Sequence, residues 1–197
     1  FLGVGTTSLG GVATIETKSS PVTSGVTTTI VSIGDTHTGV KVLVNINPDL
    51  TRNEEFEAVE LNIVHDGTNI EMMEYGRLTT NLGGSAATGL GTYHAYFSGS
   101  SLNVDFIPTS VGIATTGVIN TIQVGLSTNT ITGIGTADLT RARLEARTTS
   151  ISASGSPGIN TVAEYPENYH AAYFIAQVTD TTNTSTQLSE LIVVDDY

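Results

Sequence analysis

Apolar and polar residues alternate with a period of two along most of this chain, a pattern that predicts β-strands. In residues 40–46 (VKVLVNI) every second residue is a valine or isoleucine, and residues 59–64 place Val59, Leu61 and Ile63 on one face. Further strands are predicted at 25–33, 118–126, 172–179 and 188–194. Residues 53–61 (NEEFEAVEL) resemble a helix only briefly, and their second half alternates, so we expect a loop leading into a strand.

Two segments carry the turn residues of β-hairpins. Residues 61–75 place Asp66 and Gly67 between two strands, and glycine adopts positive φ there without steric cost. Residues 91–97 and 102–106 flank a second turn, SGSS. Short strands separated by such turns predict an all-β fold, built from antiparallel β-sandwich or jelly-roll-like units.

Composition supports the all-β prediction. The 197 residues include 33 threonines and 21 glycines, while charged residues make up 13%, about half the usual quarter of a globular domain. Threonine is β-branched and favours pleated sheets, and glycine supplies turns. The length accommodates one sizeable sandwich or two small ones with a hydrophobic core.

The net charge of −12 argues against a nucleic-acid partner and against anionic membranes, because both require a cationic surface. We interpret it as favouring solubility. The chain has no cysteine, which excludes disulfides, thiolate nucleophiles and cysteine-ligated metals. No stretch approaches the roughly 18 apolar residues of a membrane span, and no signal peptide is expected. Because the chain begins at Phe1, we expect a processed protein or a piece of a longer one.

The chain shows self-similarity at a spacing of about 130 residues. Residues 3–18 (GVGTTSLGGVATIETK) resemble 133–147 (GIGTADLTRARLEAR), with a one-residue gap. Residues 40–51 resemble 171–182, and ELNIVHD (60–66) resembles ELIVVDD (190–196). Three blocks in the same order at nearly constant offset predict an internal duplication.

The duplication predicts the domain organisation. We expect an N-terminal arm at 1–19, a β-sandwich unit at 20–127, and a linker with a second copy of the first half of the unit at 128–197. Half a sandwich exposes strand edges and an apolar face. Three outcomes are open: the parent protein continues, a neighbouring subunit completes the unit, or the two half-units pack together.

Four histidines, His37, His65, His94 and His170, are the candidates for acid–base chemistry or transition-metal ligation at neutral pH. None lies in an HxH or HExxH spacing, so we interpret them as surface or hydrogen-bonded residues. No GxSxG nucleophile elbow precedes a helix. The segment GVGTTSLGG resembles a phosphate-binding loop, but it lacks the lysine and the following helix, so we predict a linker or edge strand there and at GIGTADLTR.

Acidic and aromatic residues give no clear site. The acidic residues Glu54, Glu55, Glu57, Glu60, Asp66, Asp195 and Asp196 are candidates for calcium ligation, but no DxDxDG-type loop is present and a solvated face is favoured. A polysaccharide depolymerase would need paired carboxylates in an aromatic-lined cleft, yet tryptophan is absent. The aromatic residues within predicted strands, expected to pack in the core and between strands rather than to form a ligand platform, are Tyr93, Tyr96, Phe97, Tyr173 and Phe174. We therefore predict no catalytic, cofactor-binding or metal-binding residues.

Residues 60–81 (ELNIVHDGTNIEMMEYGRLTTN) and 91–108 (GTYHAYFSGSSLNVDFIP) resemble a repeat domain of virion structural proteins, tail-fibre-like or appendage proteins of contractile-tailed marine cyanophages. Residues 171–194 resemble the first half of the same repeat. In that family a DTTN turn is followed by an SELxVVHDGT hairpin, an EYG strand and an FSGSL hairpin. The resemblance implies a virion-associated, non-enzymatic role with oligomeric assembly.

The leading prediction is a phage virion structural protein of tail-fibre, appendage or capsid-decoration type, located in the virion and assembling through strand edges and repeat stacking. Its partners would be further copies of itself, other virion proteins and a host-surface glycan, with affinity gained through multivalency. The alternative is a bacterial extracellular adhesin, S-layer or filament subunit at the cell surface. A carbohydrate-binding module is a third class.

Overall fold

The structure of the chain is a computed structural model. The structure describes residues 5–10, 12–47, 56–80, 89–109, 116–127, 134–139, 142–149, 151, 161, 171–180, 182 and 185–194. Every regular element in these residues is a β-strand, and all strand pairs are antiparallel, so the all-β prediction is confirmed. Within the same residues, no helix has the length and hydropathy needed to cross a membrane.

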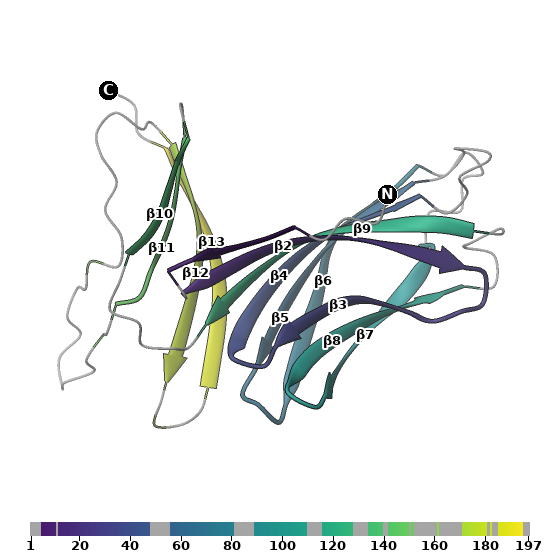
Figure 1. Cartoon of the computed structure of the whole chain (residues 1–197), viewed down its shortest axis with the longest axis horizontal. Helices are drawn as coiled ribbons and strands as arrows, with labels where there is room; N and C mark the ends of the chain where they lie inside the picture. The colour runs from purple at the N-terminus through teal and green to yellow at the C-terminus, as the bar shows by residue number, and fades with distance from the viewer. Residues whose placement is uncertain are drawn as a thin grey trace.

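Two sheets form the larger part of the molecule (Figure 1). A six-stranded sheet has the order β1-β2-β9-β4-β5-β6, and a three-stranded sheet has the order β3-β8-β7. The strands of the first are β1 (Gly5–Leu9), β2 (Ala13–Thr23), β9 (Thr116–Ser127), β4 (His37–Asn47), β5 (Glu57–His65) and β6 (Ile70–Thr79). Those of the second are β3 (Thr28–Gly34), β8 (Ser101–Pro108) and β7 (Gly91–Ser98).

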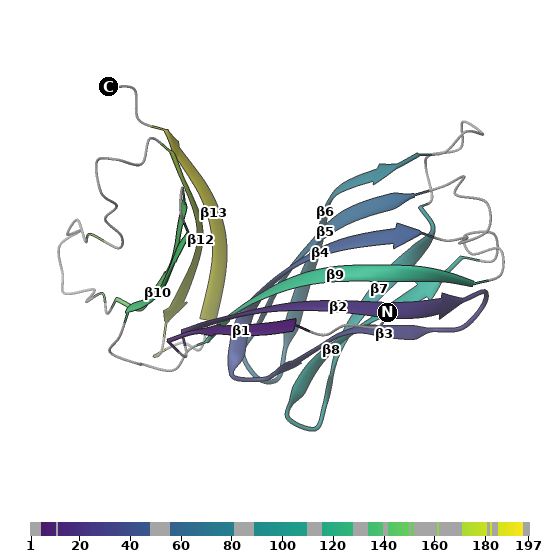
Figure 2. The same ribbon diagram turned by 45° about the horizontal axis from the view of Figure 1, so that its top comes forward.

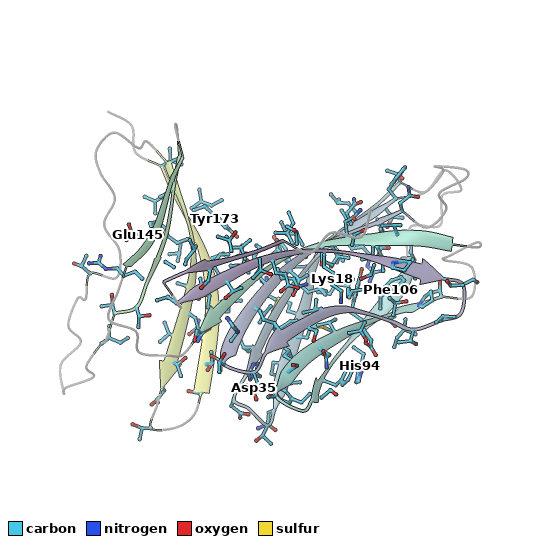
Figure 3. The ribbon with its side chains drawn as sticks, in the orientation of Figure 1. Lys18, Asp35, His94, Phe106, Glu145 and Tyr173 are labelled. Carbon is cyan, nitrogen blue, oxygen red and sulfur yellow. The ribbon has the colours of Figure 1, made fainter. Side chains whose placement is uncertain are left out.

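The hydrophobic core lies between these two sheets. The alternating residues of β4 and β5 that the sequence places on one face, such as Val42, Leu61 and Ile63, are fully buried in it. The three-stranded sheet contributes Val104 and Phe106 (Figure 3). Burying each such side chain contributes about 1.5–3 kcal/mol, so this core is the main source of stability.

Both predicted hairpins are confirmed. β5 and β6 join through Asp66 and Gly67, and the φ of Gly67 is 92°. Asp66 closes this turn, because its carboxylate accepts the backbone N–H groups of Thr68 and Asn69 at 2.8 and 2.7 Å. The bonds from Asn69, and then from Thr68, lower the pKa of Asp66 to about 2. β7 and β8 join through a turn with Gly99 at φ 60°.

Two further hairpins lie beside one another at one end of the molecule (Figures 1 and 2). β10 (Ile134–Leu139) pairs with β11 (Ala142–Arg147), and β12 (Ala171–Asp180) pairs with β13 (Ser185–Val194). Each hairpin is a two-stranded sheet of its own. β10 contacts β1, and β13 contacts β4 and β5 of the six-stranded sheet.

The strands near the predicted boundary at residues 19 and 20 lie at different positions in the six-stranded sheet. β1, in the segment expected to be a linker or edge strand, is an edge strand of the six-stranded sheet. β2 runs across residues 19 and 20 and lies inside that sheet, next to β9. The described sheets are not closed, and jelly-roll units in tandem stay a prediction.

Candidate functional site

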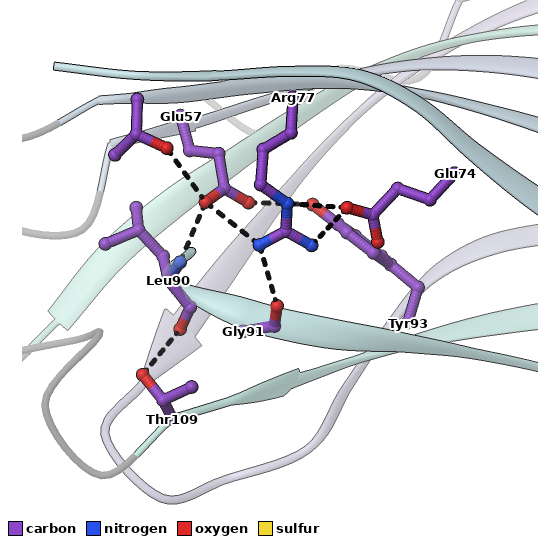
Figure 4. Close-up of polar contacts among 8 residues, drawn as sticks. Glu57, Glu74, Arg77, Leu90, Gly91, Tyr93 and Thr109 are labelled. Carbon is purple, nitrogen blue, oxygen red and sulfur yellow. Dashed lines mark hydrogen bonds and ion pairs between the residues drawn. The ribbon is translucent and has the colours of Figure 1, made fainter. Parts of the chain in front are cut away.

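A buried carboxylate, Glu57, is the centre of a polar cluster between the two sheets (Figure 4). Its side chain is 0% exposed, although the sequence favoured a solvated acidic face, and that prediction is wrong for this residue. Glu57 begins β5 on the inward side, two residues before Val59, so strand alternation turns it into the core.

Every oxygen of Glu57 is bound. Oε2 accepts the backbone N–H of Leu90 at 2.7 Å and pairs with Nη1 of Arg77 at 3.3 Å. Oε1 accepts the hydroxyl of Tyr93 at 3.4 Å. Arg77 also pairs with Glu74 at 2.5 Å and donates to the carbonyl of Gly91. The cluster connects β5 and β6 to β7, which is a structural role. A buried charged group needs such partners, because leaving it unpaired is strongly destabilising.

The surroundings of this cluster shift two pKa values. Burial, and then the negative charge of Glu57, raise the pKa of Tyr93 above its usual range. The hydrogen bond to Glu74, which outweighs partial burial, raises the pKa of Arg77. Tyr93 therefore stays neutral and Arg77 charged, and neither is poised to exchange a proton near neutral pH.

A second polar cluster joins the C-terminal hairpin to the outer face of the six-stranded sheet. Lys41 of β4 pairs with Glu60 of β5 at 2.9 Å and with Glu190 of β13 at 2.6 Å. Its ammonium also donates to the hydroxyl of Tyr173 at 2.8 Å, and that hydroxyl donates to Glu190 at 2.7 Å. Lys41 is only 7% exposed because the hairpin covers it.

Each charge in this second cluster is stabilised by its partners. Burial opposes the charged form of Lys41, but the hydrogen bonds with Glu190, Tyr173 and Glu60 raise its pKa above the ordinary value. Burial also opposes the charged form of Glu190, and the bonds from Lys41 and Tyr173 lower its pKa. The contacts of Glu60 and Glu190 with one lysine bind the hairpin to the sheet.

A glycine lets the hairpin approach β4 closely. Gln177 of β12 donates to the hydroxyl of Thr38 at 2.7 Å. A Cβ on the neighbouring Gly39 would lie 2.3 Å from Oε1 of Gln177, so a larger residue would require the end of this side chain to move. The contact between hairpin and sheet is therefore polar and close.

The described histidines are hydrogen-bonded or exposed, as the sequence predicts, and they do not form a shared site. His65 is buried: its Nε2 lies 2.9 Å from the carbonyl of His37, its Nδ1 accepts the N–H of Gly67, and its ring meets Phe97 edge-on at 5.0 Å. His94 is exposed on β7 (Figure 3). His170, Glu54, Glu55, Asp195 and Asp196 lie outside the described residues.

Exposed apolar side chains gather on the outer face and at one edge of the six-stranded sheet. β6 is the edge strand opposite β1, and its outward residues Met73, Tyr75 and Leu78 are 64%, 65% and 71% exposed. A shallow open depression of about 560 Å³ crosses the same face, with Leu43 and Ile122 in its lining. β13 also carries exposed apolar residues, among them Ile192 and Val194.

These features bear on the remaining sequence predictions. Among the described residues, no three His, Asp or Glu side chains are placed to hold one metal ion. Tyr93 lies in the core as predicted. Tyr173 is 52% exposed and packs beside Lys41, so it is not in the core, but it makes an inter-strand contact through its hydrogen bond to Glu190 of β13. The contacts of Lys41 with Tyr173 and Glu190 join residues more than 130 positions apart, and no local sequence signal marks them.

The comparisons with known proteins identify no family. No family model and no curated protein sequence matches the chain. Among solved structures, the chain is similar to a tailspike protein from Acinetobacter baumannii bacteriophage Fri1, a capsular polysaccharide depolymerase, with a TM-score of 0.38 and 13% identity. The similarity covers 67% of this chain and 21% of the tailspike, so the chain spans about a fifth of that protein. A likeness this distant carries no argument about function.

Proposed function

We propose that this chain is a non-catalytic structural protein of a phage virion, of the tail-fibre, appendage or capsid-decoration type. It assembles with further copies of itself and with other virion proteins through the edges and outer faces of its sheets. The virion assignment rests on the resemblance of residues 60–81, 91–108 and 171–194 to phage appendage repeats.

The observation that carries the proposal is the edge strand β6. Soluble monomers protect sheet edges with charges, prolines, bulges or covering elements, because an open edge pairs with other chains. β6 has one bulge opposite β5 and carries the charged residues Glu71, Glu74 and Arg77, yet its outward face also carries Met73, Tyr75 and Leu78 in exposed positions. Apolar residues along an edge are typical of interfaces between subunits.

The polar clusters support a structural role. Both oxygens of Glu57 are bonded inside the core, and Glu60 and Glu190 are both held by Lys41. General acid–base catalysis needs a group that is within hydrogen-bond reach of a substrate. These carboxylates instead hold strands together.

A charge placed on the β6 edge tests the proposal. We expect Leu78→Lys to reduce the oligomer population, measured by light scattering at a fixed protein concentration, because an edge lysine opposes pairing. Val26→Lys is the matched control: it adds the same charge at an exposed residue in the turn between β2 and β3. If the two substitutions reduced the oligomer population equally, or if neither reduced it, assembly through β6 would be contradicted.

A further inference from the structure

The β12–β13 hairpin is held on the six-stranded sheet by side chains. Among the described strands it is a two-stranded sheet of its own, so no ladder of main-chain hydrogen bonds connects it to β4 or β5. Its attachment includes the contacts of Lys41 with Glu190 and Tyr173, and the hydrogen bond from Gln177 to Thr38. Separating the hairpin from the sheet therefore leaves the strand pairing of both parts intact.

The sheet forms its half of this contact by itself. Lys41 of β4 and Glu60 of β5 pair at 2.9 Å, and Thr38 and Gly39 lie on β4 just before Lys41. Gly39 has no side chain, which leaves room for the end of Gln177. We call Thr38, Gly39, Lys41 and Glu60 the hairpin site. Because β4 and β5 supply all of it, the site is the same for a hairpin of its own chain and for one of another copy.

The contact is not fully satisfied in the docked hairpin. Oε1 of Gln177 is buried without a hydrogen-bond partner among the described residues, and so is Oδ1 of Asn62, which lies opposite Lys41 on β5. A buried acceptor without a partner costs free energy. Ile192 and Val194 of β13 also stay 75% and 72% exposed. These features weaken the docked state relative to a fully bonded contact, and so favour release of the hairpin.

A released hairpin needs another partner, because a two-stranded hairpin is at best marginally stable in water. Exchanging an identical element between copies replaces each lost contact by the same contact, so it is a low-cost route to assembly. Residues 148–170 connect β11 to β12, and a chain of this length spans at most about 80 Å when fully extended. The hairpin is therefore able to reach the sheet of a neighbouring copy.

We propose that the hairpin site binds the β12–β13 hairpin of a second copy of this chain, so that copies assemble by exchanging hairpins. The inference rests on the proposed function and deepens it, because it names the segment and the site through which copies join. Charge complementarity selects the partner, since the hairpin brings Glu190 and the hydroxyl of Tyr173 to the ammonium of Lys41. Reciprocal exchange gives a closed dimer, and one-way exchange gives a filament.

Disulfide formation between copies tests the exchange, since the chain has no cysteine of its own. A Cβ at residue 39 would lie 3.4 Å from Cγ of Gln177, so thiols at these two positions would meet. We expect a Gly39→Cys chain mixed with a Gln177→Cys chain to form a linked heterodimer with oxidised glutathione, measured on a non-reducing gel. Gly34→Cys, at an exposed position, replaces Gly39→Cys as the control and should give at least tenfold less heterodimer.

A chain with both substitutions separates exchange from docking within one chain. Gly39→Cys/Gln177→Cys forms an internal disulfide when the hairpin stays on its own sheet, and a disulfide between chains when it is exchanged. We expect the share of linked dimer to rise with protein concentration. Only the internal disulfide at every concentration, with no heterodimer of the single variants, would overturn the proposal. No disulfide of either kind would overturn it too, because the contact itself would then be absent.

Charge reversal tests the same site without a covalent link. Lys41→Glu presents an acidic site to the Glu190 of its own chain, and Glu190→Lys brings a lysine to its own Lys41. Mixing the two variants lets each hairpin bind a site of opposite charge on the other chain. We expect the mixture to dimerise at a concentration at least tenfold lower than either variant alone, measured by light scattering. Equal association of the mixture and the single variants would contradict exchange.

These experiments separate the hairpin site from the proposed function. Oligomers that form without a disulfide between chains would assemble elsewhere, which overturns exchange and leaves the structural role. Linked dimers from a chain whose oligomers are unaffected by Leu78→Lys would keep the hairpin site and remove assembly through β6.

Discussion

At the scale of single residues, the structure makes its strongest prediction for Glu57, as a residue that stabilises the fold. It is fully buried, and it joins Arg77, Leu90 and Tyr93. We expect Glu57→Ala to lower the free energy of unfolding by about 3 kcal/mol, because it leaves a buried N–H and part of a guanidinium unpaired. Urea unfolding measures the change. Glu71→Ala, at an exposed position of β6, should change the free energy of unfolding by less than about 0.5 kcal/mol.

A similar effect of Glu57→Ala and Glu71→Ala would contradict the structural role of the Glu57 cluster. The alternation of Val59, Leu61 and Ile63 already places Glu57 on the inward face, so its burial could be predicted from the sequence. Its partner Arg77 could not, because it lies beyond a bulge in the next strand, where the simple alternation is interrupted.

His65 makes the stability of the chain depend on pH. Both ring nitrogens are used: Nε2–H donates to the carbonyl of His37, and Nδ1 accepts the N–H of Gly67. Burial is the main cause that lowers the pKa of His65, and the nearby ring of His37 lowers it further. The hydrogen bond to the carbonyl of His37 and the charges of Asp35 and Asp66 raise this pKa, but by less. Protonating Nδ1 would replace an acceptor by a second donor facing the N–H of Gly67.

The sign of the pH effect follows from the lowered pKa of His65. The unfolded chain binds this proton at about pH 6.5 and the folded chain only at lower pH, so the free energy of unfolding decreases as the pH falls below 6.5. We expect His65→Gln to flatten this decrease between pH 7.5 and 5.5, measured by urea unfolding. His94→Gln, at an exposed position, is the control. Equal slopes for both variants would contradict the assignment.

At the scale of elements, the hairpins could be predicted from the sequence, but the order of the strands in each sheet could not. Asp66-Gly67 and SGSS mark two turns, and the strands on either side pair as expected. β2 has no apolar alternation in its first half, because Glu16 and Lys18 occupy inward positions there. The insertion of β9 between β2 and β4 joins residues about 100 positions apart, and no local pattern reports such pairing.

The contact between the C-terminal hairpin and the sheet includes a close approach of Gln177 to Gly39. We expect Gly39→Ala to displace Gln177 and loosen the hairpin, because the new Cβ would lie 2.3 Å from its Oε1. Amide hydrogen exchange in β12 and β13 should then become faster, while β4 and β5 stay protected by their own sheet. Gly34→Ala is the control, since a Cβ there meets only ordinary contacts. Unchanged exchange in the Gly39 variant would contradict the contact.

At the scale of the whole molecule, the structure combines one well-packed pair of sheets with two hairpins, each a two-stranded sheet of its own among the described residues. A two-stranded hairpin is at best marginally stable alone, so packing against a neighbour is needed. For the β12–β13 hairpin, part of this packing comes from the six-stranded sheet, through the contacts of Lys41 and Gln177. The exposed residues Ile192 and Val194 of β13 and Leu78 of β6 remain available for contacts between molecules.

The mass of the purified chain in solution tests the central claim of assembly most directly. Light scattering over a range of protein concentrations, with electron microscopy of the same samples, measures it. The account predicts a discrete oligomer or a filament. Its population should grow with salt, because screening weakens the repulsion between chains of charge −12. A stable monomer of 20.5 kDa at every concentration and salt would contradict assembly through sheet edges.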